Sequence, residues 1–98
     1  MTLTALLDLT LTPKSLVDAP EVLRETLQDT RAFPGCFGVE VLRSTQEPTR
    51  ILLVERWESV EADAAYRAWR ATPQGASRLR TLLAGPPSLT TFTTEPGI

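Results

Sequence analysis

The first part of the chain alternates between apolar and polar positions and then changes to a helical pattern. Across residues 2–12, leucine or alanine occupies every second position, which predicts a strand with one strongly apolar face. From Pro20 to Pro34, apolar residues recur at the spacing of a helix that is buried on one side. Either Ser15 or Asp18 can cap the start of this helix, and proline is well tolerated in a first helical turn.

The next apolar stretches predict a hairpin. Phe37, Val39 and Val41 alternate with their neighbours, so a second strand is expected to carry these side chains on one face. Residues 45–49 form a polar segment that contains proline, and residues 50–57 form a third apolar stretch. Because the connection is short and polar, the second and third strands are expected to pair with each other.

A second helical pattern follows the third strand. Ser59 offers a hydroxyl cap, and the acidic residues just after it favour the positive end of a helix dipole. This helix is expected to end near Ala71. The pair Thr72 and Pro73 has the cap-then-proline pattern of another helix start, which predicts a further helix that stops at Gly85.

The order of these elements predicts the fold. Residues 89–94 form a threonine-rich last strand, and residues 95–98 are expected to be a loose tail. The order strand, helix, strand, strand, helix, strand is typical of an α+β, ferredoxin-like βαββαβ fold with an antiparallel sheet. At 98 residues, the chain is expected to form a single domain, residues 1–98.

The third strand is apolar on both faces. Ile51 and Leu53 point to one side of the predicted sheet, and Leu52 and Val54 point to the other. The helices of this fold cover only one side. A homodimer that packs two sheets face to face would cover the second apolar side, so we expect a homodimer.

Composition excludes several kinds of partner. The net charge is −2, with 10 basic and 12 acidic residues spread along the chain, so nucleic acid is not expected as a partner. No apolar run approaches the roughly 20 residues of a membrane span, and no membrane association is expected. Residues 1–8 lack the basic region of a signal peptide. With a single cysteine and no possible internal disulfide, a cytoplasmic location is expected.

The chain contains neither histidine nor asparagine. Sites that depend on histidine are therefore excluded, including His–Ser and His–Cys catalytic pairs and a histidine-ligated haem, and zinc or copper sites are not expected. No metal is assigned. Any proton transfer must use carboxylates, tyrosine, arginine-polarised groups, the backbone or water.

The large amphipathic side chains concentrate between the third strand and the second helix. Trp57 either forms an aromatic wall with an indole donor or fills the core between strand and helix. Tyr66 and Trp69 share a helix face, where Tyr66 either donates its hydroxyl to a substrate or packs on the sheet. Arg70 follows on the same face and either holds an anionic oxygen or pairs with the helix dipole.

An acidic residue, Glu55, is expected on the same strand face as apolar side chains. A buried acid needs a partner or a function. Arg56 and Arg50, on the opposite strand face, are the candidate partners at strand ends or across the dimer. Arg31 is expected to bind the carbonyl groups at the end of the first helix. Cys36 is expected to be an inert buried thiol.

Two short motifs carry a resemblance to a known family. The run TRAFPGC at residues 30–36 resembles a corner of the antibiotic biosynthesis monooxygenase family, and ERWES at residues 55–59 resembles the segment before that family's second helix. The resemblance implies a dimeric α/β barrel with a cavity between sheet and helices. It also implies oxidation of aromatic phenols or anthrones, including polyketide-type compounds, to quinones with molecular oxygen and no metal or flavin cofactor. Haem-degrading relatives use an asparagine and a histidine, which this chain lacks.

The resemblance and the residue pattern together give a set of candidate site residues for a small hydrophobic aromatic ligand. Two alternatives remain open: a ligand-binding or cyclisation accessory protein without oxidation, and a purely structural dimer module. The catalytic candidates are Trp57, Tyr66 and Arg70, and the substrate-binding candidates are Trp69, Glu55, Phe37 and Phe92.

Overall fold

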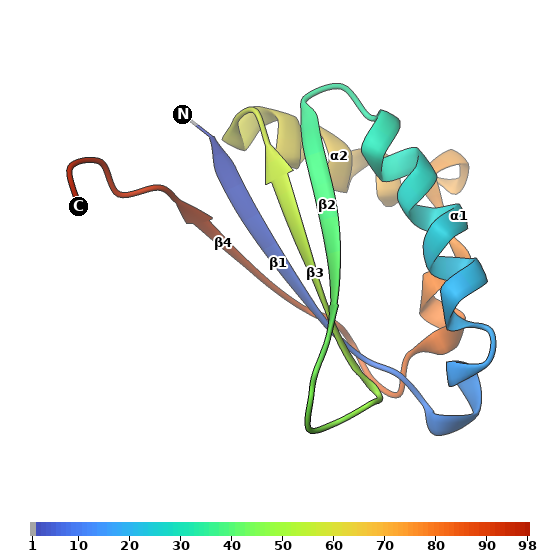
Figure 1. Ribbon diagram of the computed structural model, residues 1–98. Helices are drawn as coiled ribbons and strands as arrows, with labels where there is room; N and C mark the ends of the chain where they lie inside the picture. Colours follow the sequence, from blue (N-terminus) through green and yellow to red (C-terminus); the bar gives the residue numbers. More distant parts are fainter. Residues whose placement is uncertain (1) are drawn as a thin grey trace.

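The alternating and helical patterns form four strands and two α-helices in a computed structural model, which describes residues 2–98. Figure 1 shows the helices on one side of the sheet. Three short 3₁₀ helices complete the chain: η1 (Pro13–Leu16), η2 (Pro73–Gly75) and η3 (Arg78–Leu82). The larger elements are β1 (Leu3–Thr10), α1 (Ala19–Ala32), β2 (Cys36–Arg43), β3 (Arg50–Trp57), α2 (Val60–Arg70) and β4 (Ser88–Thr93).

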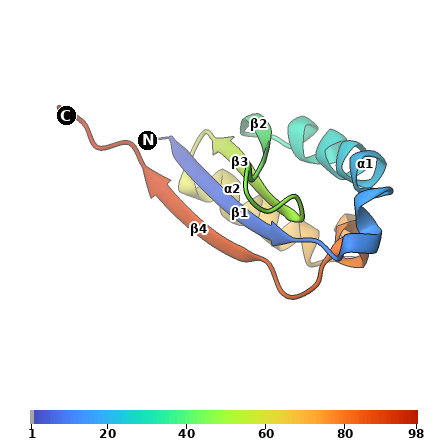
Figure 2. The same cartoon turned by 60° about the horizontal axis from the view of Figure 1, so that its bottom comes forward.

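The strands form a single antiparallel sheet in the order β2-β3-β1-β4. This order and the alternation of strands and helices confirm the predicted ferredoxin-like α+β fold. Figure 2 shows β4 along the outer side of β1, at one edge of the sheet, while β2 forms the other edge. The predicted hairpin of β2 and β3 is also confirmed, and β3 has the predicted bounds.

Side-chain caps explain where the second helix begins. The hydroxyl of Ser59 accepts a hydrogen bond from the backbone N–H of Ala62 at 3.1 Å, as expected for an N-cap. Asp18 occupies the N-cap position of α1, but its side chain makes no capping bond, and Ser15 lies earlier, in η1. The first helix therefore begins without the side-chain cap that the sequence offered.

The prediction of a helix from Thr72 to Gly85 is wrong. Two 3₁₀ helices stand there instead, capped by the hydroxyls of Thr72 and Ser77. The chain folds back against the end of α2 at Gly75, where a β-carbon would collide with the carbonyl oxygen of Trp69. This tight reversal interrupts the helical path, although Leu82 still reaches the core as a helical pattern would require.

The alternation in β2 is interrupted near its start. Cys36 pairs with Trp57, and Gly38 pairs with the preceding residue of β3, so Phe37 is an extra residue in a β-bulge. The side chain of Phe37 is 63% exposed, whereas Val39 packs against the core. The simple alternation predicted that Phe37 and Val39 share one face of the strand, and the bulge shows that they do not.

Two apolar clusters fill the space between the sheet and the helices. The larger one joins α1 and η3 to the sheet and is built from Leu9, Leu11, Ala19, Val22, Leu23, Leu27, Ile51, Leu53 and Leu82. The smaller one lies between α2 and the opposite end of the strands and contains Leu3, Ala5, Trp57 and Tyr66. Their separation leaves the middle of the covered face for the candidate site.

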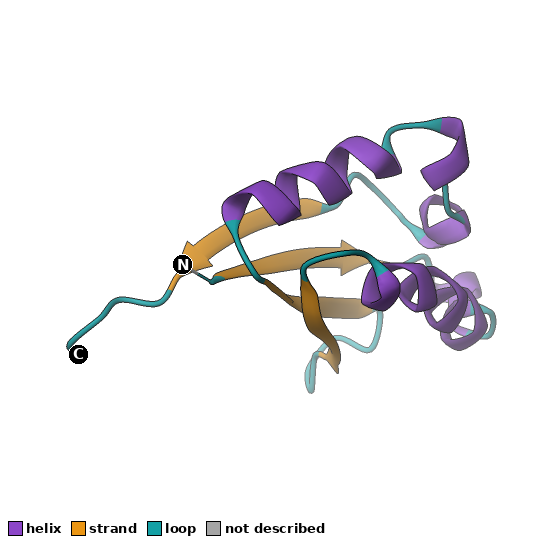
Figure 3. Ribbon diagram, turned by 90° about the horizontal axis from the view of Figure 1, so that it is seen from above, coloured by secondary structure: helices purple, strands orange, loops and turns teal. Residues whose placement is uncertain are grey.

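The other face of the sheet has no helix over it. Leu6, Leu52 and Val54 are half-buried there, while Leu42 and Phe92 are 42% and 51% exposed. Beyond β4, the chain extends away from the rest of the molecule (Figure 3). Within residues 2–98, none of the helices combines the length and apolar character that crossing a membrane requires.

Candidate functional site

A cavity of about 1160 Å³ lies between the covered face of the sheet and the segment that runs from α2 to β4. This volume lies slightly above the range of about 300–1,000 Å³ that is usual for small-molecule sites. Its polar lining includes Glu55 on β3, Thr26 on α1, and Tyr66, Arg67 and Arg70 on α2, together with residues of the following segment such as Arg80. The apolar lining includes Leu7, Leu27, Leu53, Leu79 and Leu83. The cavity is thus mostly apolar, with Glu55, Tyr66, Arg67 and Arg70 on one wall and Arg80 on η3.

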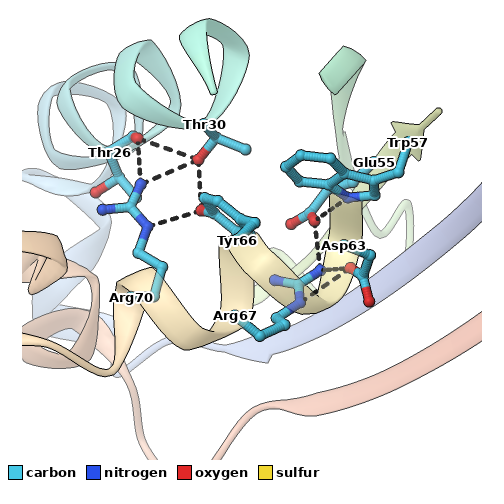
Figure 4. Close-up of polar contacts among 8 residues, drawn as sticks. All are labelled: Thr26, Thr30, Glu55, Trp57, Asp63, Tyr66, Arg67 and Arg70. Carbon is cyan, nitrogen blue, oxygen red and sulfur yellow. Dashed lines mark hydrogen bonds and ion pairs between the residues drawn. The ribbon is translucent and has the colours of Figure 1, made fainter. Parts of the chain in front are cut away.

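Glu55 provides the carboxylate of this wall. It lies opposite Ala5 of β1 and Val39 of β2, in the gap between the two apolar clusters, and is only 1% exposed. Its Oε1 accepts two hydrogen bonds, one from Arg67 Nη2 at 2.6 Å and one from the indole Nε1 of Trp57 at 3.1 Å (Figure 4). The prediction that this acid needs a partner is confirmed.

The other oxygen of Glu55, Oε2, has no hydrogen-bond partner within residues 2–98. Every fully buried side-chain oxygen or nitrogen of the described residues does have such a partner. Oε2 therefore retains a small accessible surface on a side chain that is 2% exposed, and Glu55 is one of the residues that line the cavity. A carboxylate with one oxygen held and the other free has room to accept a proton.

Arg67 links this carboxylate to a second acid. Its Nη2 also lies 3.0 Å from Oδ1 of Asp63, four residues earlier on α2. The side chain of Arg67 is 26% exposed, compared with 2% for that of Glu55. One guanidinium thus balances two carboxylates, as the right half of Figure 4 shows. The pairing keeps a charged Glu55 tolerable in a largely apolar region.

The hydroxyl of Tyr66 belongs to a separate chain of hydrogen bonds, on the left of Figure 4. It lies 2.7 Å from Oγ1 of Thr30 and accepts a bond from Nε of Arg70 at 2.7 Å. Oγ1 of Thr30 also lies 3.3 Å from the carbonyl oxygen of Thr26. Either hydroxyl can be the donor in the shorter Tyr66–Thr30 bond, which joins α2 to α1 in both cases.

Arg70 ties three parts of the fold together. Its guanidinium donates to Tyr66 and also to two residues of α1. The acceptors there are the carbonyl oxygen of Thr26, at 2.8 Å, and the side-chain oxygen of Thr30, at 3.0 Å. It also donates to the carbonyl oxygen of Gly75 at 3.1 Å. These bonds use four of the five guanidinium N–H groups, so one remains for a ligand.

Aromatic rings surround the Tyr66 side chain. The ring centre of Trp57 lies 4.8 Å away, and that of Phe33 lies 5.3 Å away in an edge-to-face arrangement. The guanidinium carbons of Arg67 and Arg70 lie 5.0 and 5.2 Å from the centre of the Tyr66 ring. Tyr66 therefore separates the two arginines and fixes both by cation–π contact.

The structure brings some of the predicted site residues together and separates others. Glu55, Tyr66 and Arg70 line the cavity. Trp57 is fully buried behind Glu55, and Trp69 packs beside the Phe33 ring. The two phenylalanines lie elsewhere: Phe37 is in the exposed bulge, and Phe92 is on the uncovered face, where it pairs with Thr4.

Within one chain, three predicted arginine contacts are not formed. Arg50 pairs with Asp8 across the uncovered face, at 2.7 Å, and lowers the pKa of Asp8 through a side-chain hydrogen bond. Arg56 lies on that same face and donates to Thr4. Neither arginine can reach Glu55, because adjacent positions of a strand point to opposite faces. Arg31 donates to the carbonyl oxygen of Val39 on β2, and not to the end of its own helix.

Sequence reasoning missed Arg67, the true partner of Glu55, and the role of Thr30. Two signals pointed to them. Arg67 follows Asp63 by one helical turn on the element that packs over Glu55. Thr30 is a polar residue at a core position of α1, which requires a buried hydrogen-bond partner.

Cys36 is half-buried, and burial raises the pKa of its thiol, as an inert role requires. Residues 2–98 contain no group of three or more acidic or cysteine side chains placed to hold a metal ion.

Comparison with known proteins identifies the family. The sequence model of the antibiotic biosynthesis monooxygenases matches residues 3–76. The chain belongs to this family. A comparison with curated proteins found no match.

Solved structures with low sequence identity share the fold of this family member. Rv0793 from Mycobacterium tuberculosis superposes with a TM-score of 0.78 at 19% identity, covering 97% of this chain and 96% of its own. A protein from Nitrosomonas europaea, named as a candidate antibiotic biosynthesis monooxygenase, has a TM-score of 0.81 at 17% identity. The match covers 98% of this chain and 92% of that protein. A protein from Deinococcus radiodurans, named in the same way, has a TM-score of 0.77 at 21% identity. The match covers 100% of this chain and 96% of that protein.

Proposed function

We propose that this protein is a monooxygenase that converts a hydrophobic aromatic substrate, such as a phenol or an anthrone of polyketide type, to a quinone with molecular oxygen. Family membership supports the reaction class. The observation that carries the proposal is the composition of the cavity, where Glu55, Arg67 and Arg70 face a large and mainly apolar space. In this reaction the substrate anion supplies the electrons, so neither a metal nor a flavin is needed.

Glu55 is the base in this proposal. Its Oε2 takes a proton from the methylene carbon of the anthrone, which lies opposite the carbonyl in the central ring, while Arg67 and the free N–H of Arg70 stabilise the resulting conjugated oxyanion. The anion then gives electrons to oxygen, and a carbon–oxygen bond forms. Loss of water leaves the quinone, so that one oxygen atom enters the product and the other leaves as water.

Trp57, Tyr66 and Trp69 act on this reaction through position. The indole of Trp57 holds Oε1 of Glu55, which leaves Oε2 toward the cavity. Tyr66 keeps the two arginine side chains apart and fixed. Trp69 supports the Tyr66 ring from outside the cavity. In this arrangement the groups in contact with substrate are Glu55, Arg67, Arg70 and the surrounding leucines.

The test is anthrone oxidation with and without oxygen, comparing Glu55→Gln with the control Glu58→Gln. Glu58 is an exposed acid three residues further along, so the control makes the same chemical change away from the cavity. Loss of a general base should lower kcat about 100-fold or more. Oxygen uptake and quinone absorbance measure the rate, and circular dichroism verifies that both variants are folded.

Equal rates with and without oxygen would rule out the oxygenase. A Glu55→Gln variant whose kcat per folded molecule equals that of the control would remove Glu55 as the base and leave it a structural role. A normal kcat with a raised KM would instead assign Glu55 to substrate binding.

A ligand-binding or cyclisation accessory protein is the second candidate. The observation that favours it is that the hydroxyl of Tyr66 and most N–H groups of Arg70 already form hydrogen bonds within the protein. Such a protein would bind an aromatic ligand in the same cavity and consume no oxygen. Calorimetric titration with an anthrone under argon, beside oxygen-uptake measurements in air, separates the two candidates.

We also propose that two copies pack through the uncovered face of the sheet. The support is the apolar row formed there by Leu6, Leu42, Leu52 and Val54, because an exposed apolar area of this kind marks an interaction site. The variant Leu52→Glu places a charge in that row and should convert the dimer to monomer in light scattering. Gln74→Glu, an exposed position outside the sheet, is the control. A wild-type monomer at high concentration would contradict the proposal.

A further inference from the structure

A second hollow, of about 470 Å³, lies on the other side of the first helix, between α1 and the β2–β3 hairpin. It is lined by Pro20, Leu23, Arg24, Leu27, Arg31, Val41, Arg43 and Ile51. Of these residues, only Leu27 also lines the large cavity. We call this hollow the arginine cleft. It shares one wall with the candidate active site, but all of its charged groups are different.

The charged groups of the arginine cleft are all cationic. Arg24, Arg31 and Arg43 line it, and no acidic residue does, although the whole chain has a net charge of −2. None of the three forms an ion pair within residues 2–98. By contrast, Arg50 and Arg78 are each paired with an acid on the surface. Three unpaired guanidinium groups around one hollow create a positive potential that attracts an anion.

Backbone geometry keeps these arginines near one another. Arg24 and Arg31 are seven residues apart on α1, which places them two helical turns apart on the same face. The side chain of Arg31 reaches the sheet, where it donates to the carbonyl oxygen of Val39 at 3.0 Å. This bond uses one of its five N–H groups and leaves the others for a ligand. Arg43 lies across the cleft, paired in register with Ile51 of β3.

The floor of the arginine cleft is apolar. Leu23 and Leu27 of α1 and Ile51 of β3 are almost fully buried, and they belong to the larger core cluster. Val41, which is 39% exposed, adds an accessible apolar surface at the edge strand. A fully hydrated inorganic anion would gain nothing from this floor. A molecule with an apolar body and an anionic end would satisfy both parts of the cleft.

We propose that the arginine cleft binds an amphipathic anion, namely a carboxylate or phosphate ester attached to a hydrocarbon or aromatic body. The anionic end binds the guanidinium groups of Arg24, Arg31 and Arg43, which suit carboxylates and phosphates alike. The apolar body lies along Leu23 and Val41. The site is separate from anthrone oxidation and does not depend on it.

The test is calorimetric titration of the full chain with octanoate, octyl phosphate and the neutral octan-1-ol. The variant Arg24→Gln/Arg43→Gln should bind the anions about tenfold more weakly or worse, since each hydrogen bond to a charged group carries that much affinity. Both residues are exposed, so the variant is expected to fold. Lys14→Gln/Arg78→Gln removes the same charge at exposed positions outside both hollows and should bind as the wild type does.

Backbone amide spectra locate the ligand. Octanoate should shift the amide signals of residues 23–31 and 41–43, and leave those of residues 70–87 unchanged. Tighter binding of octyl phosphate would assign the cleft to organic phosphates, and tighter binding of octanoate would assign it to carboxylates. Failure of both anions to bind, equal binding of octan-1-ol, or equal loss in both double variants would overturn the proposal.

Discussion

Replacing Tyr66 with phenylalanine tests the hydrogen-bond chain that joins the two helices. The change removes one oxygen and keeps the ring that packs against Trp57 and Phe33. Two bonds are lost, one to Thr30 and one from the charged guanidinium of Arg70, both at 2.7 Å. A neutral bond contributes about 1 kcal/mol and one to a charged group about 1.5–3 kcal/mol.

Part of that loss is recovered. Oγ1 of Thr30 still receives a bond from Nη2 of Arg70 at 3.0 Å, so it is not left without a partner. Arg70 lines the cavity, where water can replace the lost hydroxyl as a partner of its guanidinium. The net cost should therefore be about 2 kcal/mol of unfolding free energy. In a domain of this size, that corresponds to a fall in Tm of about 10 °C.

Thermal unfolding followed by circular dichroism, at fixed protein concentration, measures this effect. The double-mutant cycle with Thr30→Val adds a sharper test, since residues in one hydrogen-bond network should show a coupling energy of about 0.5–3 kcal/mol. If Tyr66→Phe changes Tm by less than about 2 °C and the cycle is additive, the hydroxyl does not stabilise the contact between α1 and α2. A large loss of kcat at unchanged Tm would instead make the Tyr66 hydroxyl catalytic.

Two further predictions concern the backbone and the surface. Gly75→Ala should lower the free energy of unfolding by about 3 kcal/mol or more, because its β-carbon would meet the carbonyl group of Trp69. Gly85→Ala, with open space around it, should change that free energy by about 1 kcal/mol or less. Equal urea midpoints for the two variants would refute this. Arg50 lowers the pKa of Asp8, so their pair stabilises the fold above the ordinary Asp pKa of 3.8 and loses that effect as the pH falls through the lowered value. The difference in Tm between wild type and Asp8→Asn should accordingly shrink below about pH 4, and a difference independent of pH would contradict the assignment.

Local patterns predicted most of the fold. The alternation in residues 2–12 gave β1, and the cap at Ser59 marked the start of α2 correctly. Both signals depend on neighbours within one turn or one strand. The predictions failed where a contact between successive elements or between strands intervened. Gly75 packs on the end of α2 and turns an expected helix into 3₁₀ pieces, and the bulge at Phe37 depends on the register with β3.

The sequence alone determined the element order, the ferredoxin-like fold, the burial of Glu55 and the closeness of Tyr66 to Arg70, because strand and helix periodicities fix which side chains share a face. Only the tertiary structure decided which groups meet across elements. It paired Glu55 with Arg67, joined Tyr66 to Thr30, placed Phe92 on the uncovered face, and gathered three arginines in a cleft. These contacts depend on how α1 and α2 pack over the sheet, which no local spacing encodes.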